Sequence, residues 1–302
     1  MTPKVAFWIY DEWAFGSIHK ALVKEFYKRG INADLIPWQT EYSKDEKQAL
    51  VDTYDIFVST PGPALNLLTD TWGIERERIV MISHGEWDVC EAVKYNNDLS
   101  TIKGYGVISN NLVTFSKSKG IDCPIHLLQN GILFDTFYRE PTESLNTIGY
   151  AGKLKWENHY DDVKDLKRSY LVATIGKYTN TKIHLPGKRS HLCMAGYYKD
   201  IDCVIMSSDV QEACGLPIME AAAAGRLPIA ARVGINNDMK NPTGIILPVD
   251  ETAFIEKGIE SINELKENPE LFRKKCIEAQ EFAREYYDWS KVIDPWIELI
   301  IG

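Results

Sequence analysis

Short apolar runs alternate with longer amphipathic segments along almost the whole chain of 302 residues. The apolar runs are rich in β-branched residues, and the amphipathic segments have the apolar spacing of helices. Strands separated by helices form βαβ units, which build parallel sheets because each crossover returns the chain to the same edge. The predicted strands fall into two series: 5–9, 33–36, 56–58, 79–82, 106–108 and 125–128, then 147–151, 182–185, 203–206, 227–230 and 244–247. We therefore expect an α/β chain with two parallel sheets.

The polar segment 138–146 separates the two series of strands and is the predicted joint between domains. We expect a first Rossmann-like domain over residues 1–140 and a second over residues 146–286. Helical patterns lie between the strands and dominate the last third of the chain. The clearest of them are 17–29, 44–53, 110–119, 251–265, 269–286 and 290–301.

The composition argues against several classes of protein. A net charge of -9 and a pI near 5.3 disfavour a nucleic-acid binder that relies on bulk electrostatics. No stretch approaches the roughly 20 apolar residues of a transmembrane helix. The six cysteines are scattered and none forms a CxxC pair, so neither a zinc ribbon nor a dithiol redox motif is indicated. Reduced thiols and a cytoplasmic location are the expectation.

The turn after the first predicted strand contains a single glycine, Gly16. A pyrophosphate-binding turn of a nicotinamide enzyme needs three glycines at G-x-G-x-x-G spacing. That motif and the P-loop are both absent from the sequence. A nicotinamide-dependent dehydrogenase is therefore disfavoured.

The most informative segment runs from Glu212 to Glu220 and reads Glu-Ala-Cys-Gly-Leu-Pro-Ile-Met-Glu. It follows the predicted strand 203–206, and Gly215 and Pro217 suit the start of a helix. Unpaired N–H groups at such a helix start favour a diphosphate. A carboxylate near a helix start also gains roughly 0.3–1 kcal/mol from the helix dipole, which offers a purely structural reason for Glu220. This reason does not extend to Glu212, which precedes the helix.

The segment resembles the Glu-x7-Glu signature of the retaining glycosyltransferases of family 4. Further segments of that family match in order: Asn-Gly-Ile at 130–132, Gly-Tyr-Ala-Gly-Lys-Leu at 149–154 and Thr-Gly-Ile-Ile-Leu-Pro at 243–248. The resemblance covers residues 105–290 well and the first hundred residues only in outline. It implies the GT-B fold, in which two Rossmann-like domains face a cleft and the C-terminal helix, here 287–302, crosses back to the first domain.

The resemblance assigns roles to the donor segment. Glu212 would contact the transferred sugar, and Glu220 would bind the ribose of the nucleotide. The backbone at Cys214, Gly215 and Leu216 would contact the diphosphate or the sugar.

The resemblance also implies a cationic clamp for the departing phosphate. Lys153 occupies the position of its first basic residue. The family then places a Lys-Gly pair five or six residues later, where this chain has Asn158 and His159. Lys155 or Arg168 are the candidate replacements for that lysine.

The remaining candidates are each balanced by a structural alternative. His84 would lie near the transferred sugar, or it is a loop histidine that caps the next helix. Gly16 and Ser17 would approach the donor phosphates, or they form a turn and an N-cap. Arg189 would contact the base, or it belongs to a solvated charge pair. His19 is expected to be structural or to face the acceptor.

The implied reaction is transfer of a hexose or pentose from a nucleotide sugar to a hydroxyl, with retention of anomeric configuration and without a metal, as the GT-B resemblance implies. The expected acceptor is a glycan or a lipid-linked glycan, with peripheral contact at the inner face of a membrane left open. A nucleic acid acceptor is disfavoured by the acidic balance but not excluded. The alternatives are a nucleotide-sugar epimerase of the same fold and a degenerate GT-B protein that binds sugar without turnover.

Overall fold

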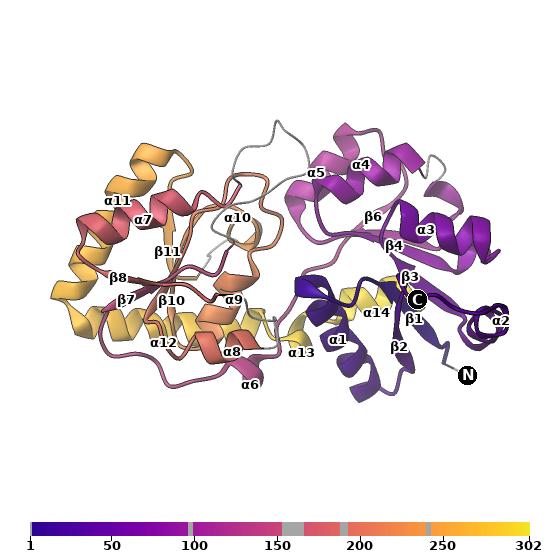
Figure 1. Ribbon diagram of the computed structural model, residues 1–302, viewed down its shortest axis with the longest axis horizontal. Coiled ribbons are helices and arrows are strands. Elements are labelled where there is room, and N and C mark those ends of the chain that lie inside the picture. The colour runs from indigo at the N-terminus through magenta and orange to yellow at the C-terminus, as the bar shows by residue number, and fades with distance from the viewer. Residues whose placement is uncertain (1, 96–98, 153–165, 188–192, 240–242) are drawn as a thin grey trace. The chain divides into compact units, whose positions relative to one another are not determined.

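The computed structural model describes residues 2–95, 99–152, 166–187, 193–239 and 243–302. The chain comprises two compact units. The first contains Met1–Gly131 together with Trp289–Gly302, and the second contains Ile132–Asp288. Each is an α/β unit with a parallel sheet, which confirms the predicted fold class (Figure 1).

The first unit has a six-stranded parallel sheet in the order β2-β1-β3-β4-β5-β6. Helices α3, α4 and α5 lie on one face of this sheet, and α1 and α14 lie on the other (Figure 1). All residues of β1, β3 and β4 are buried, which explains why these strands read as continuous apolar runs. The strands are β1 (Val5–Ile9), β2 (Ala33–Pro37), β3 (Ile56–Ser59), β4 (Ile79–Ser83), β5 (Gly104–Val107) and β6 (Ile125–Leu127), and the helices are α1 (Trp13–Lys28), α2 (Lys44–Thr53), α3 (Pro63–Asn66), α4 (Glu86–Tyr95), α5 (Asn110–Ser118), α13 (Trp289–Val292) and α14 (Asp294–Ile301).

The second unit has a five-stranded parallel sheet in the order β8-β7-β9-β10-β11. Helices α7 and α11 lie on one face and α8, α9 and α12 on the other (Figure 1). The alanine-rich helix α9 is buried from Ile218 to Ala223, because its small side chains allow close packing between the sheet and α12. The strands are β7 (Thr147–Gly149), β8 (Lys182–His184), β9 (Cys203–Met206), β10 (Leu227–Ala231) and β11 (Ile245–Leu247), and the helices are α6 (Phe134–Phe137), α7 (Ser169–Tyr178), α8 (Met194–Tyr197), α9 (Leu216–Ala223), α10 (Ile235–Asp238), α11 (Glu251–Glu267) and α12 (Pro269–Tyr286).

Every predicted strand is present, and local capping explains the helices that begin where the sequence predicts. The side chain of Ser43 accepts the N–H of Glu46 while Glu46 accepts the N–H of Ser43, and this capping box starts α2. At α12 the side chain of Asn268 accepts the N–H of Leu271, with Pro269 in the first turn. The prediction was wrong at α1, which begins at Trp13 instead of residue 17.

The predicted last helix, 290–301, is instead two helices, α13 and α14. Pro295 has no N–H to donate and its ring disfavours a continuous helix, so a new helix starts with it in the first turn. The indoles of Trp289 and Trp296 are buried and meet edge to face at 5.9 Å. Trp296 donates its indole N–H to the carbonyl of Gln129 at 2.9 Å. The last fourteen residues therefore complete the core of the first unit.

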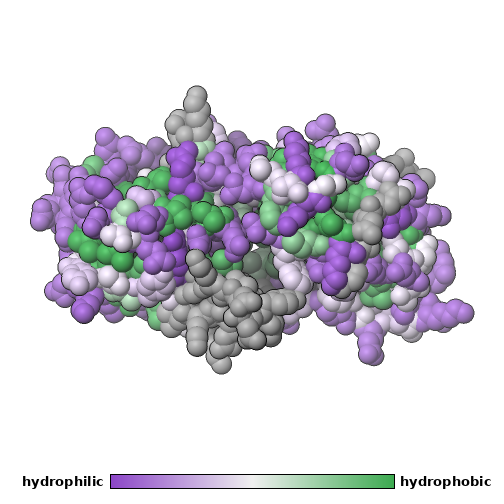
Figure 2. Space-filling model, turned by 90° about the horizontal axis from the view of Figure 1, so that it is seen from above, coloured by the Kyte–Doolittle hydropathy of each residue, from purple (hydrophilic) through white to green (hydrophobic). Residues whose placement is uncertain are grey.

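The predicted joint, residues 138–146, lies within the second unit, which begins at Ile132. Thr142 donates its N–H to Gly225, and Arg226 donates from its guanidinium to the carbonyl of Glu140 at 2.9 Å. The space-filling view shows polar side chains between smaller apolar patches on each unit, as expected from the high content of charged residues (Figure 2). In the part of the chain that the structure describes, no helix has both the length and the apolar character of a membrane span.

Candidate functional site

The strand order of the second unit reverses at β7, which lies between β8 and β9. The chain crosses from β7 to β8 in one direction and continues to β9 in the other. Such a switch point leaves a crevice outside the carboxyl ends of the two central strands, where open α/β sheets bind ligands. The segment predicted to bind the donor begins here, since it follows the last residue of β9, Met206.

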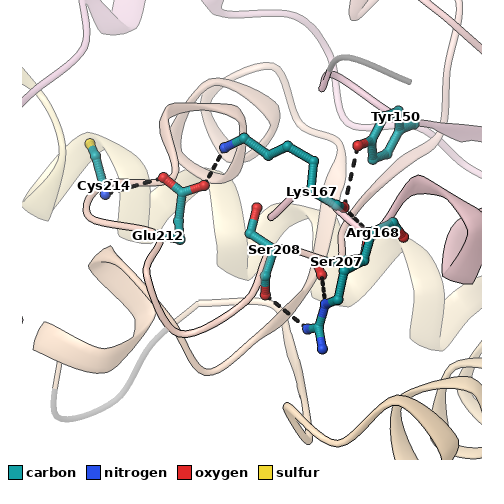
Figure 3. A network of polar contacts seen from close by, with 7 residues as sticks. All are labelled: Tyr150, Lys167, Arg168, Ser207, Ser208, Glu212 and Cys214. Carbon is teal, nitrogen blue, oxygen red and sulfur yellow. Dashed lines mark hydrogen bonds and ion pairs between the residues drawn. The ribbon is translucent and has the colours of Figure 1, made fainter. Parts of the chain in front are cut away.

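Glu212 and Lys167 form an ion pair beside this switch point (Figure 3). Their side chains are 12% and 27% exposed. The other carboxylate oxygen of Glu212 accepts the backbone N–H of Cys214 at 3.4 Å. Burial alone would raise the pKa of the Glu212 carboxyl, but the charge of Lys167 and the hydrogen bonds from Lys167, Ser208 and Cys214 together outweigh it, and the pKa lies below its usual value. Glu212 is therefore ionised at neutral pH.

The backbone of Lys167 is tied to the ends of both switch-point strands (Figure 3). Its carbonyl accepts the hydroxyl of Ser207 at 2.7 Å, just after β9, and the hydroxyl of Tyr150 at 3.3 Å, just after β7. These contacts fix the point from which the lysine side chain starts. The backbone of Lys167 is thus held at the carboxyl ends of β7 and β9.

Arg168 does not reach toward Glu212, so the suggestion that it replaces the phosphate lysine was wrong. Its guanidinium donates hydrogen bonds to the backbone carbonyls of Ser207, Ser208 and Val249 at 2.7–3.0 Å. Its backbone has a φ of 44°, in the left-handed region that glycine adopts most readily. Lys167 is therefore followed by a residue in the backbone conformation that glycine adopts most readily.

The loop after Glu212 leads into the start of α9. Gly215 has a φ of 84°, and no side chain caps the helix. Gly234, which follows β10, packs against this loop. A Cβ at Gly234 would lie 2.6 Å from the carbonyl oxygen of Cys214. The same carbonyl accepts the N–H of Ile235 at 2.8 Å. The backbone at Cys214, Gly215 and Leu216 is therefore held in one place beside Glu212.

Glu220 lies in the second turn of α9 and is only 1% exposed. Its carboxylate accepts the hydroxyl of Tyr198 at 2.6 Å. Burial and the neighbouring Glu220 together raise the pKa of the Tyr198 hydroxyl well above its usual value, so this group stays a hydrogen-bond donor. A ribose can reach Glu220 only after a local rearrangement, and its role in ribose binding stays a prediction.

The candidates of the first unit lie at the carboxyl edge of its own sheet. His84 follows β4, is 8% exposed and packs edge to face on His19 of α1, with ring centroids 5.1 Å apart. Gly16 and Ser17 lie inside α1, and a Cβ on Gly16 would lie 1.8 Å from the carbonyl oxygen of Asp11. Close packing therefore requires glycine at residue 16 whether or not it meets a ligand.

Two predicted residues, Lys153 and Arg189, lie outside the described residues, as do the candidate Lys155 and the positions of Asn158 and His159. Among the residues that are described, no three His, Cys, Asp or Glu side chains are grouped to hold a metal ion.

Comparison with known proteins finds similarity over part of the sequence and over the fold. Residues 147–264 match the family model described as glycosyl transferases group 1. Among solved structures, Anabaena HepE in complex with UDP and glucose is similar with a TM-score of 0.69, 13% identity and 98% of each chain covered. The catalytic domain of starch synthase IV from Arabidopsis thaliana, bound to ADP and acarbose, is similar with a TM-score of 0.69, 12% identity and 99% of each chain covered. Sucrose-phosphate synthase from Thermosynechococcus elongatus is similar with a TM-score of 0.67, 13% identity and 98% of each chain covered.

The chain has the GT-B fold. At these identities the likeness to the solved structures concerns the fold alone, and the family match covers the second unit only. No curated protein sequence matches the chain significantly.

Within this GT-B chain the structure brings together Glu212, Cys214, Gly215 and Leu216, as the sequence predicts. It adds Lys167, which the sequence analysis missed. The signal that could have found it is its position directly before α7, a helix that the analysis did not predict.

Proposed function

We propose that this protein is a glycosyltransferase that takes a sugar from a nucleoside diphosphate sugar and transfers it to a hydroxyl. The ion pair of Lys167 with Glu212 at the switch point carries this proposal. A departing nucleoside diphosphate gains negative charge, and a positioned cation and backbone N–H groups stabilise that charge in the transition state. Lys167 supplies the cation, and the uncapped start of α9 supplies the N–H groups.

Glu212 has a different role in this proposal. An ionised carboxylate repels phosphate, so it suits the neutral part of the donor, where sugar hydroxyls are hydrogen-bond donors. The pairing with Lys167 keeps it ionised and holds it within reach of the same ligand. Lys167 at the phosphate and Glu212 at the sugar thus distinguish the two ends of the bond that breaks.

We infer that the transfer retains the anomeric configuration and needs no metal. In this mechanism the acceptor hydroxyl attacks from the face that the diphosphate leaves, and the departing phosphate oxygen takes the acceptor proton. Lys167 balances the charge on that oxygen, and Lys153 is the second cation that the resemblance implies. Glu220 holds the ribose once Tyr198 and its neighbours have rearranged.

The structural neighbours guide the choice of substrates. HepE was solved with UDP and glucose, and starch synthase IV with ADP and acarbose. We therefore propose a UDP or ADP sugar as donor and a glycan, free or lipid-linked, as acceptor. An epimerase of the same fold would release nucleotide without an acceptor, so nucleotide release that requires an acceptor distinguishes a transferase.

The test is a thermal shift of the purified chain against UDP, ADP, GDP and their glucose conjugates. A nucleotide at a hundred times its dissociation constant should stabilise the protein by about 2.7 kcal/mol. We expect Lys167→Met to weaken the binding of that nucleotide at least tenfold, because the phosphate loses the cation that neutralises it.

The matched control is Lys257→Met, which removes a lysine from an exposed pair with Glu260 on α11 of the same unit. This variant should respond like the wild type. Equal nucleotide affinity of Lys167→Met and Lys257→Met would contradict the assignment of Lys167. Silence of the wild type toward every nucleotide would contradict the proposed donor class.

A further inference from the structure

Two histidines are buried against each other in the first unit. His19 on α1 has no exposed surface, and His84 after β4 is 8% exposed. Their rings meet edge to face, with an interplanar angle of 73° and centroids 5.1 Å apart. Phe7 packs on His19 and Phe15 on His84, with centroids 5.8 and 5.1 Å apart. The pair is therefore enclosed by aromatic side chains.

The protonation state of His19 follows from one contact. Its Nδ1 lies 2.8 Å from the backbone carbonyl oxygen of Phe15. A carbonyl oxygen can only accept, so Nδ1 carries the hydrogen. Burial lowers the pKa of His19 to about 4, so the ring is neutral at pH 7. Its buried Nε2 is then an acceptor, and it has no hydrogen-bond partner among the described residues.

His84 is neutral as well, because burial and the neighbouring His19 lower its pKa well below the usual value. A neutral imidazole carries one N–H and one bare nitrogen. Neither ring nitrogen of His84 has a hydrogen-bond partner in the described part of the chain. Its backbone N–H donates to the carboxylate of Asp88 at 2.7 Å. This contact fixes the main chain but does not involve the ring.

A buried polar group without a partner costs about 1–3 kcal/mol, so each such group calls for an explanation. Here three ring nitrogens share this condition: Nε2 of His19 and both nitrogens of His84. One hydrogen bond from the His84 N–H to His19 Nε2 would satisfy two of the three. The nitrogen that remains is an acceptor, and only a donor completes it.

We propose that His19 is a positioning residue that accepts the ring N–H of His84 and thereby presents the other nitrogen of His84 to a hydroxyl of a bound sugar. A rotation of the His84 ring closes this chain of hydrogen bonds from the ligand hydroxyl through both rings to the carbonyl of Phe15. A phosphate oxygen or a carbonyl cannot take the place of the hydroxyl, because neither donates. The choice of a sugar as ligand rests on the proposed function, whereas the coupling of the two rings does not.

The coupling is tested by ¹⁵N NMR of the histidine rings in the full chain without ligand. We expect His19 as the Nδ1–H tautomer and His84 as a single neutral tautomer. In His19→Phe the acceptor is gone, and His84 should become a mixture of tautomers. His19→Gln, which restores a side-chain acceptor, should return it toward one tautomer.

His126→Ala is the matched control, since His126 is an exposed histidine of β6 in the same unit. It should leave the His84 signals unchanged. An unchanged His84 tautomer in His19→Phe would overturn the positioning role, and so would a wild-type His19 that carries its hydrogen on Nε2. The wild-type spectrum alone decides the second point, even if the variants fail to fold.

The hydroxyl is tested by adding UDP, UDP-glucose, or UDP with glucose to the wild type. A shift of the His84 nitrogen signals with UDP-glucose but not UDP assigns the hydroxyl to the donor sugar. A shift only with UDP and glucose together assigns it to the acceptor. No shift under conditions where the thermal assay shows binding would overturn the hydroxyl role. No thermal response at all would instead count against the proposed function, while the tautomer result would stand on its own.

The kinetic consequence separates positioning from a merely structural role. His19→Phe should lower kcat about tenfold and leave KM for the nucleotide sugar within about twofold, because the phosphate contacts lie in the other unit. A parallel loss in melting temperature with unchanged kcat would overturn the proposal.

Discussion

The two sheets share one strand order but differ in the polar groups at their carboxyl edges. In each unit the second strand in sequence lies outside the first, and the third lies on the other side. The edge of the second unit holds the charged pair of Lys167 and Glu212, whereas that of the first holds the neutral pair of His19 and His84. The same scaffold can therefore offer charge for a diphosphate at one edge and neutral acceptors for hydroxyls at the other.

The difference comes from what surrounds each pair. The side chain of Lys167 is 27% exposed and lies beside the carboxylate of Glu212, so each charge has a partner of opposite sign. The two imidazoles are enclosed by aromatic rings, and an unpaired charge in such a setting is too costly to keep.

The largest effect is expected from Glu212→Gln. The amide keeps the size of the side chain but removes the charge, and it leaves Lys167 without its counter-ion. Loss of one preorganised electrostatic contact in an active site typically costs about 10²–10³ in kcat. We expect a loss of that size in transfer with little change in melting temperature, measured by steady-state kinetics and calorimetry. Wild-type turnover would remove Glu212 from the mechanism.

A smaller effect is expected from alanine at two tightly packed glycines. Gly234→Ala combines a φ of 54° and a ψ of -134° with a Cβ that would clash with Cys214, so it should cost about 1–3 kcal/mol and displace the donor loop. We expect about tenfold weaker nucleotide binding by calorimetric titration. Gly16→Ala should destabilise the first unit without changing nucleotide affinity. Gly196→Ala is the control, since a Cβ there meets nothing within 4 Å. Equal nucleotide affinity in all three variants would show that the loop position is irrelevant.

The smallest effect is a difference in acid sensitivity. A buried histidine with a lowered pKa takes up its proton more readily when unfolded, so His19 adds stability that is lost as the pH falls from 6.5 to about 4. His84 acts in the same direction. Asp88 opposes them, because burial raises its pKa to about 6 and stability falls as the pH rises from 3.8 to 6. The lowered pKa of Glu212 matters only below about 4.5, where its contribution is lost as the pH falls further.

Denaturant unfolding at pH 4.5, 5.5 and 6.5 measures this difference. We expect His19 and His84 to raise the stability of the wild type over this range, and the raised pKa values of Asp88 and Glu86 to oppose part of that rise. His19→Phe should flatten the slope by up to about 1.4 kcal/mol per pH unit. The control His126→Ala should keep the wild-type slope. A slope that is the same in His19→Phe would show that His19 is not buried in its neutral form.

Much of the fold was predictable because local signals agree with the tertiary structure. The fully buried strands, the capping box at Ser43 and the Asn268-Pro269 start of α12 can each be recognised from neighbouring residues alone. The division of the last helix was missed, although Pro295 is visible in the sequence, because the apolar stripe continues across it.

The site was predictable only in part. Glu212, Cys214 and Gly215 lie in one short motif, so their proximity follows from the sequence. Lys167 joins them from forty-five residues away, through a backbone position tied to Ser207 and Tyr150. The pairing of His19 with His84 likewise depends on how α1 packs against the end of β4. Such contacts between distant segments leave no local pattern to read.

The return of Trp289–Gly302 to the first unit has a consequence for synthesis. The ribosome makes this segment only after the whole of Ile132–Asp288, so the second unit can fold while the first still lacks Trp289 and Trp296. Domains usually fold in the order in which they emerge. Here the unit that emerges first completes its core last, and the part of β5 that packs against Leu299 of α14 stays uncovered until then.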